Sequence, residues 1–115
     1  MDSKLRYLVQ VVYADGSVYL SVTTERPTTV EQRLRDRVIQ NQKIPGWIPT
    51  TVIQQYVSQH MDEIGESEIL DVFTDTCAAN ESFNEMFDLA ITSGINLLNT
   101  NKKNTRITNP NFVRS

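Results

Sequence analysis

An Asp-Gly pair between two alternating apolar runs is the feature that most limits how this chain can fold. The first run, LRYLVQVVY, occupies residues 5–13, and the second, VYLSVTTE, begins at Val18. Asp15-Gly16 lies in the segment that joins them. The tightest hairpin turns need a positive φ at both central residues, and Asp-Gly is one of the pairs that provide it. The sequence therefore predicts a β-hairpin over residues 5–24.

The residues that follow the hairpin repeat with helical spacing. Pro27 ends the second strand, and a helix is predicted after it from apolar residues spaced four apart: Val30, Leu34 and Val38. Thr28 and Glu31 have the spacing of a capping box, in which each side chain bonds the backbone N–H of the other residue. Glu31 and Arg35 have the spacing and order of a favourable surface ion pair.

A second helix is predicted after Pro49. Thr51 and Gln54 repeat the capping-box spacing. One face of this helix is apolar: Ile53, Val57, Met61 and Ile64. Gly65 is placed to end the helix, because glycine adopts the left-handed conformation that helix ends favour.

The segment SEILDVFTDT, residues 67–76, fits either a strand or the first turn of a helix. Short apolar runs do not separate the two, and a third strand is favoured here. A third helix is predicted from Ser82 and Glu85, which again have capping-box spacing, and from a broad apolar face: Phe83, Met86, Phe87, Ala90, Ile91, Ile95 and Leu98. The sequence therefore predicts an α+β fold of order ββααβα. Its N-terminal hairpin and possible third strand pack against about three helices, expected on one side of the sheet.

The chain of 115 residues is long enough for one core without disulfides. Residues 1–100 are predicted to form a single α+β domain, and the polar, asparagine-rich residues 101–115 a flexible tail. The only cysteine is Cys77, which excludes an internal disulfide and fits a reducing compartment. No apolar run approaches the roughly 18 residues of a membrane span, and the N-terminus lacks the pattern of a signal peptide. We therefore expect a soluble cytoplasmic protein.

Charge is distributed unevenly along the chain. Residues 44–101 contain nine acidic residues and no lysine or arginine, and all eleven basic residues lie before or after this stretch. Two explanations are equally open: the acidic and basic parts meet within the monomer, or the acidic surface binds another molecule. The second explanation makes three carboxylates at helical spacing candidates for partner binding: Glu81, Glu85 and Asp88.

The sequence contains no complete catalytic constellation. Cys77 and His60 are the only cysteine and histidine, and nothing in the sequence places them together. A buried structural thiol and a packing histidine are favoured over a nucleophile and base. The carboxylates match no known metal-binding loop, and the four glycines never cluster into a phosphate-binding loop. We predict no catalytic residue, no metal and no cofactor, and an enzyme is the less favoured class.

The segment KIPGWIPTT, residues 43–51, carries the only tryptophan. Pro45-Gly46 suits the centre of a type II turn. Trp47 either covers the open end of the core, which is favoured, or anchors a partner. Ile44 and Ile48 flank Trp47 and would form an apolar knob if exposed, so all three are candidate partner-binding residues.

Basic residues concentrate near the first predicted helix. Four of them are candidates for holding an anion or nucleic acid: Arg26, Arg33, Arg35 and Arg37. Interspersed acidic residues and a pI of about 5.0 favour a salt-bridging surface helix over nucleic-acid binding.

Three functions follow from these patterns, in order of preference. The first is a non-catalytic interaction module, an adaptor or inhibitor, that binds a protein partner through its acidic surface and the Trp47 loop. Unpaired sheet edges would also favour a homodimer. The second is a small-ligand or nucleotide-binding protein or minor enzyme, with arginines gripping an anion in a pocket between sheet and helices and Asp71 or Asp75 as acid–base. The third is nucleic-acid binding through the arginine-rich helix. Membrane association is not expected.

Overall fold

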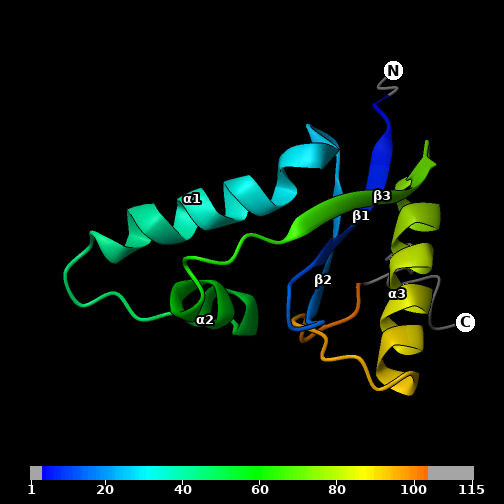
Figure 1. The fold of residues 1–115 in the computed structure, drawn as a ribbon. Helices are drawn as coiled ribbons and strands as arrows, with labels where there is room; N and C mark the ends of the chain where they lie inside the picture. The colour runs from blue at the N-terminus through cyan, green and yellow to red at the C-terminus, as the bar shows by residue number, and fades with distance from the viewer. Residues whose placement is uncertain (1–3, 104–115) are drawn as a thin grey trace, which may run out of the picture.

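The computed structural model describes residues 4–103, and most of the predicted tail, residues 101–115, lies outside this range. The observed order ββααβα confirms the predicted α+β fold (Figure 1). The elements are β1 (Arg6–Val12), β2 (Val18–Thr23), a 3-10 turn η1 (Pro27–Thr29), α1 (Val30–Gln42), α2 (Val52–Gln59), β3 (Glu66–Phe73) and α3 (Thr76–Thr92). No helix in the described part of the chain is long and apolar enough to cross a membrane.

The three strands form one antiparallel sheet of order β2-β1-β3, which confirms both the hairpin and the third strand. The hairpin turn differs in detail from the predicted type. Gly16 has a φ of 88°, but Asp15 has no positive φ. The turn is instead closed by the Tyr13 N–H, which donates to the Ser17 carbonyl at 2.9 Å. The Asp15 carboxylate supports it by accepting the Ser17 N–H at 2.9 Å.

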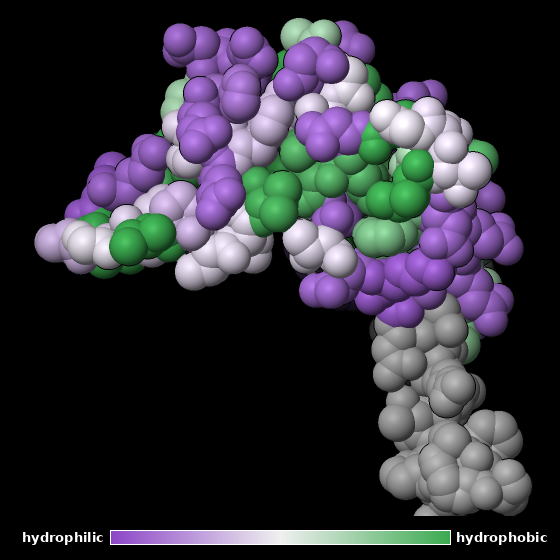
Figure 2. Space-filling view, turned by 90° about the horizontal axis from the view of Figure 1, so that it is seen from below, coloured by the Kyte–Doolittle hydropathy of each residue, from purple (hydrophilic) through white to green (hydrophobic). Residues whose placement is uncertain are grey.

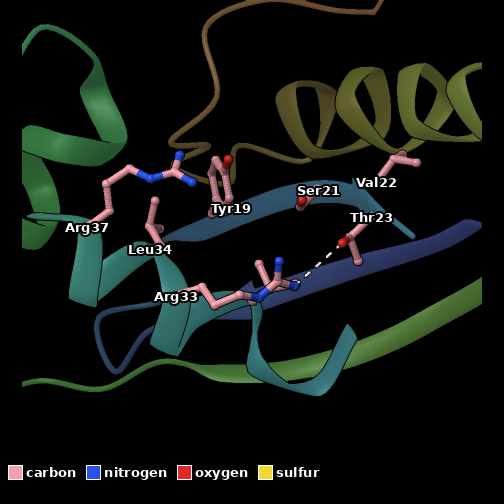
Figure 3. Close-up of a pocket in the computed structure, with 8 residues that line it drawn as sticks. Tyr19, Ser21, Val22, Thr23, Arg33, Leu34 and Arg37 are labelled. Carbon is pink, nitrogen blue, oxygen red and sulfur yellow. Dashed lines mark hydrogen bonds between the residues drawn. The ribbon is translucent and has the colours of Figure 1, made fainter. Parts of the chain in front are cut away.

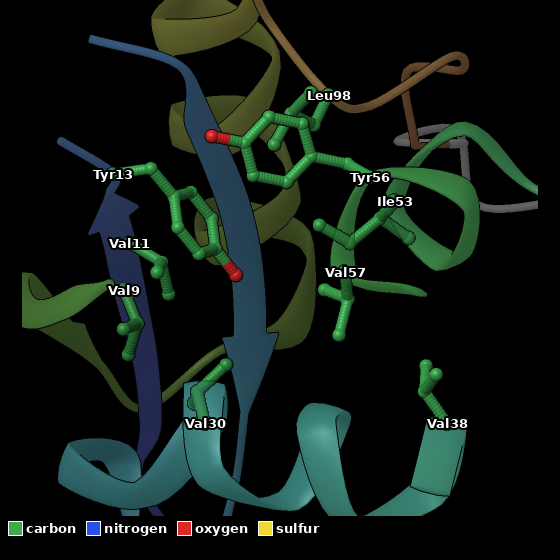
Figure 4. Close-up of a cluster of buried hydrophobic side chains, with 9 residues drawn as sticks. All are labelled: Val9, Val11, Tyr13, Val30, Val38, Ile53, Tyr56, Val57 and Leu98. Carbon is green, nitrogen blue, oxygen red and sulfur yellow. The ribbon is translucent and has the colours of Figure 1, made fainter. Parts of the chain in front are cut away.

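Helices cover both faces of the sheet, so the expectation that all three lie on one side is wrong. Val9 and Val11 point towards α1 and α2, in a cluster completed by Tyr13 and Leu98 (Figure 4). Leu8 points the other way, into a cluster with Phe83 of α3. Figure 1 shows α1 and α2 on one side of the strands and α3 on the other. Because β1 is apolar at both odd and even positions, it needs a cover on each face.

The predicted helix starts are correct for α2 and wrong for α3. Thr51 caps α2, since its side chain accepts the Gln54 N–H at 3.2 Å, but the Gln54 side chain accepts the Thr50 N–H at 3.1 Å and not the Thr51 N–H of the predicted capping box. The third helix begins at Thr76, well before the predicted cap at Ser82, because Asp75 accepts the Ala78 N–H at 3.0 Å.

Helices α2 and α3 both end several residues before their predicted ends. The second helix ends at Gln59, so Gly65 is not its cap. Gly65 instead enters β3 where a Cβ atom would lie 2.6 Å from a methyl carbon of Val11, so only glycine fits there without displacement. The third helix ends at Thr92, where Gly94 adopts a φ of 77° and the following N–H bonds back to Ala90 at 3.0 Å.

The chain after α3 covers the outer edge of β2. The Val18 N–H donates to Asn96 at 3.0 Å, and the Leu98 N–H donates to Val18 at 2.8 Å. The Asn99 side chain then bonds both backbone groups of Leu20, at 2.8 and 2.9 Å. The edge of β2, one of the two that would have favoured a dimer, is therefore closed within the monomer from Val18 to Leu20.

Candidate functional site

The Trp47 loop combines a half-buried tryptophan with exposed neighbours. The predicted turn is confirmed by the Gly46 φ of 79° and by the Trp47 N–H, which donates to the Ile44 carbonyl at 3.1 Å. Trp47 packs against the cluster beneath α1 and α2, whereas Ile44 is 53% and Ile48 72% exposed. Figure 2 shows apolar side chains at the projecting end of the molecule, where this loop lies. The tryptophan therefore covers the core, and the two isoleucines form the exposed knob.

The acidic residues of the cation-free stretch are all exposed to solvent. The nine are Asp62, Glu63, Glu66, Glu68, Asp71, Asp75, Glu81, Glu85 and Asp88. Asp88 pairs with Lys102 at 2.9 Å, and it is the one member with an ion pair among residues 4–103. The acidic and basic parts of the chain therefore do not neutralise each other within the described monomer.

The predicted partner-binding residues fall on two separate surfaces. Glu81, Glu85 and Asp88 lie on the solvent side of α3. The Trp47 loop follows α1, on the other side of the sheet (Figure 1). The structure therefore does not bring the loop and the α3 carboxylates together.

Strand β3 carries a second group of carboxylates, of which the sequence analysis named only Asp71, as a possible acid–base residue. Glu66 and Glu68 stand opposite Val12 and Gln10 of β1, and Asp71 stands opposite Leu8. Residues directly opposite in a sheet share a face, so these carboxylates lie on the α3 side. In the sequence, Glu66 and Glu68 lie two residues apart. This spacing places both carboxylates on one face if the segment is a strand, so it points to a shared surface only once the strand is known.

The outer edge of β3 is open in the described structure. The strand lies at the end of the sheet and pairs only with β1 among residues 4–103. One backbone N–H of the strand already has a partner within the strand, because the Asp71 carboxylate accepts the Val72 N–H at 2.8 Å. On the face away from the carboxylates, Ile69 is 39% and Val72 43% exposed. An extended chain added at this edge would meet carboxylates on one face and apolar side chains on the other.

The predicted surface pair of Glu31 and Arg35 is instead a buried ion pair. Glu31 is 2% and Arg35 5% exposed, and their charged groups are 2.5 Å apart. Tyr13 donates its hydroxyl to the Glu31 carboxylate at 3.1 Å. Glu31 therefore does not act in the predicted capping box, and the 3-10 turn η1 occupies the position of that cap.

Arg35 also joins α1 to the chain between α2 and β3. Its guanidinium donates to the carbonyls of His60 at 3.2 Å and Met61 at 2.9 Å, and to that of Glu63. All five N–H groups of a buried guanidinium need partners, and the carboxylate and carbonyls supply them. Arg35 is therefore a structural residue, and its burial makes it unsuitable for the predicted anion or nucleic-acid contact.

Arg33 and Arg37 remain available to a ligand, in a pocket between α1 and β2 (Figure 3). The pocket has a volume of about 170 Å³ and is lined by Tyr19, Ser21, Val22, Thr23, Val30, Arg33, Leu34 and Arg37. Tyr19, Ser21 and Thr23 alternate along β2, so their side chains lie on the same face of the sheet, the one that α1 covers. This alternation was visible in the sequence, but the face that α1 covers was not.

Arg26, the fourth predicted anion contact, is exposed beside η1 and does not line the pocket.

The tyrosine that holds Glu31 predicts a loss of stability at alkaline pH. Burial, and then the Glu31 carboxylate, raise the pKa of Tyr13 well above its ordinary value of 10.0. The folded protein keeps this proton where the unfolded chain releases it, so the contribution is complete below about pH 10 and is lost above it. We expect the urea midpoint to fall between about pH 9 and pH 11, and to fall less in Tyr13→Phe. Parallel pH profiles for the two proteins would contradict this assignment.

The other residues considered for catalysis, His60 and Cys77, do not lie together in the structure. His60 stacks on Tyr56 with ring centroids 4.0 Å apart, and its Nδ1 lies 2.8 Å from the Tyr56 carbonyl. Cys77 lies in the first turn of α3, on the other side of the sheet, and is half-buried. Within residues 4–103, no group of three or more histidine, cysteine or acidic side chains is placed to hold a metal ion.

Comparisons of the chain with protein-family models, curated proteins and solved structures found no match. The surfaces available to a partner are thus the acid-bearing edge of β3, the acidic side of α3 and the isoleucine knob. The pocket of Arg33 and Arg37 is available to a small ligand.

Proposed function

We propose that this protein is a non-catalytic interaction module that binds a basic, extended segment of a protein partner along β3. The observation that carries the proposal is an open edge strand whose carboxylates line one face. Addition of a strand to an open edge is a common mode of peptide recognition, in which main-chain hydrogen bonds give affinity and side chains give selectivity.

The two faces of β3 specify the partner's sequence. Glu66, Glu68 and Asp71 favour lysine or arginine on the α3 side of the added strand. Ile69 and Val72 favour apolar side chains on the opposite side. A partner strand that alternates basic and apolar residues satisfies both. The α3 carboxylates, Glu81, Glu85 and Asp88, add a longer-range attraction for the same cations.

Two copies of the protein are not expected to pair through their β3 strands, because that pairing would bring like charges together. The homodimer that the sequence predicts would therefore use another surface, and we propose the knob of Ile44 and Ile48 for it. A reducing compartment such as the cytoplasm suits a chain that contains a single cysteine, Cys77.

Binding of a labelled peptide of alternating lysine and valine, followed by fluorescence anisotropy, tests the role of β3. The variant Glu66→Gln/Glu68→Gln/Asp71→Asn is expected to bind about tenfold more weakly, because three exposed ion pairs of roughly 0.5 kcal/mol each amount to about 1.5 kcal/mol. The asparagine at position 71 retains an oxygen that can accept the Val72 N–H.

The matched control removes the same charge from α3, in Glu81→Gln/Glu85→Gln/Asp88→Asn. Its affinity is expected to fall less than about threefold, since these carboxylates lie away from the edge. Two further peptides, one N-methylated at every lysine and one at every valine, keep the charge of the parent but each can pair along one edge only. Because strand addition to β3 uses one edge of the peptide, one of the two is expected to bind more weakly than the parent peptide. Equal losses in the two variants of the protein, or full binding of both methylated peptides, would refute strand addition and leave only charge attraction.

A further inference from the structure

We propose that the pocket between α1 and β2 binds the phosphate group of a small phosphate monoester. This site is independent of the β3 edge, since it lies beside the opposite edge strand of the sheet. Arg33 and Arg37 are one helical turn apart on α1, and both reach over β2 (Figure 3). Two guanidinium groups match the double negative charge of a phosphate monoester better than the single charge of a carboxylate.

Arg33 is held in place before any ligand arrives. Its Nη2 donates to the carbonyls of Glu25 at 2.8 Å and Arg26 at 3.0 Å, and lies 3.4 Å from the Thr23 hydroxyl. Its Nε lies 3.3 Å from the Thr29 hydroxyl. These bonds leave Nη1 without a partner among residues 4–103 and fix the plane of the guanidinium. A fixed donor loses little side-chain entropy when it binds an anion.

Arg37 provides the second positive charge and has no hydrogen bond or ion pair within residues 4–103. Tyr19 of β2 lines the same pocket, and burial raises the pKa of its hydroxyl, while the positive charge of Arg37 lowers that pKa by a smaller amount. The Tyr19 hydroxyl therefore keeps its proton and can donate to an anion. The hydroxyl of Ser21 completes the set of donors on the β2 side.

The size and walls of the pocket limit the ligand. Its volume of about 170 Å³ exceeds the roughly 30 Å³ of one water molecule and falls below the roughly 300 Å³ or more of sites for drug-sized ligands. Val30 and Leu34 form an apolar wall beside the arginines. The pocket therefore fits a phosphate group with a small apolar substituent and is too small to enclose a nucleotide.

Titration of the full chain with phenyl phosphate, followed by amide NMR, tests this site. We expect shifts concentrated at Tyr19, Ser21 and Thr23 and along α1 between Arg33 and Arg37. The variant Arg37→Gln is expected to weaken binding about tenfold or more, the loss typical for a charge-assisted hydrogen bond. Arg37 is preferred to Arg33 for this test because Arg33 also holds η1, so its loss would disturb the fold.

Lys43→Gln is the matched control, because it removes one exposed positive charge just after α1 and outside the pocket. Its affinity is expected to change less than about twofold. Benzoate is expected to bind at least about tenfold more weakly than phenyl phosphate, and inorganic phosphate several-fold more weakly. Equal losses in the two variants, equal binding of benzoate, or tighter binding of inorganic phosphate would overturn the proposed ligand class. Shifts that are absent from these amides would overturn the site.

Discussion

Replacing Arg35 with methionine is expected to lower the free energy of unfolding by about 3–5 kcal/mol, enough to unfold much of a marginally stable domain. The substitution leaves the Glu31 carboxylate buried, with the Tyr13 hydroxyl as its remaining partner. It also removes the donor from three backbone carbonyls in the chain between α2 and β3. Unpaired buried charge and unsatisfied carbonyls both raise the free energy of the folded state. Urea unfolding followed by circular dichroism measures the change.

The double variant Glu31→Leu/Arg35→Met separates the buried pair from the rest of the loss. Removing both charges leaves no uncompensated ion, so its loss of stability is expected to be smaller than the sum of the two single losses by at least about 1 kcal/mol. The three carbonyls stay unsatisfied in this variant, so it is not expected to recover fully. Additive losses would show that Glu31 and Arg35 act independently, which would contradict the buried pair.

Replacing Phe83 with alanine is expected to cost about 3–5 kcal/mol, because it empties the centre of the contact between α3 and the sheet. Phe83 is 2% exposed and meets Leu8 and Leu20 in the second core cluster. The lost area and the cavity left behind both contribute to the cost. Chemical denaturation of the full chain measures it.

Leu89→Ala is the matched control on the same helix. Leu89 is 56% exposed, so its truncation is expected to change stability by no more than about 0.5 kcal/mol. A small effect of Phe83→Ala, or equal effects of the two substitutions, would mean that α3 is not packed on the second face of the sheet.

Local chemistry was sufficient to predict the features whose determinants lie within a few residues. The hairpin followed from alternation around Asp15-Gly16, and the Pro45-Gly46 turn from the φ values that these residues favour. The cap at Thr51 also formed as its spacing predicts. The same spacing failed at Ser82, because Asp75 offers an earlier cap that a continuous helix can use.

The predicted binding residues divide in the same way. Exposure of Glu81, Glu85 and Asp88 followed from their helical spacing, whereas the sequence left open whether Ile44 and Ile48 are exposed, and only the structure shows that both are. The burial of Arg35 could not be predicted, because its partner carbonyls are 25 to 28 residues away along the chain. The open edge of β3 likewise depends on which strand lies beside it.

The sequence by itself determined the order of helices and strands, the principal turns and the long stretch without cations, because these depend on neighbours in the chain. Tertiary structure alone decided that α3 takes the face of the sheet opposite α1, that Glu31 and Arg35 are buried, and that residues 96–99 close the β2 edge while β3 stays open. These outcomes depend on contacts between distant segments. A residue's spacing shows which side chains can share a face, but not which other segment that face will meet.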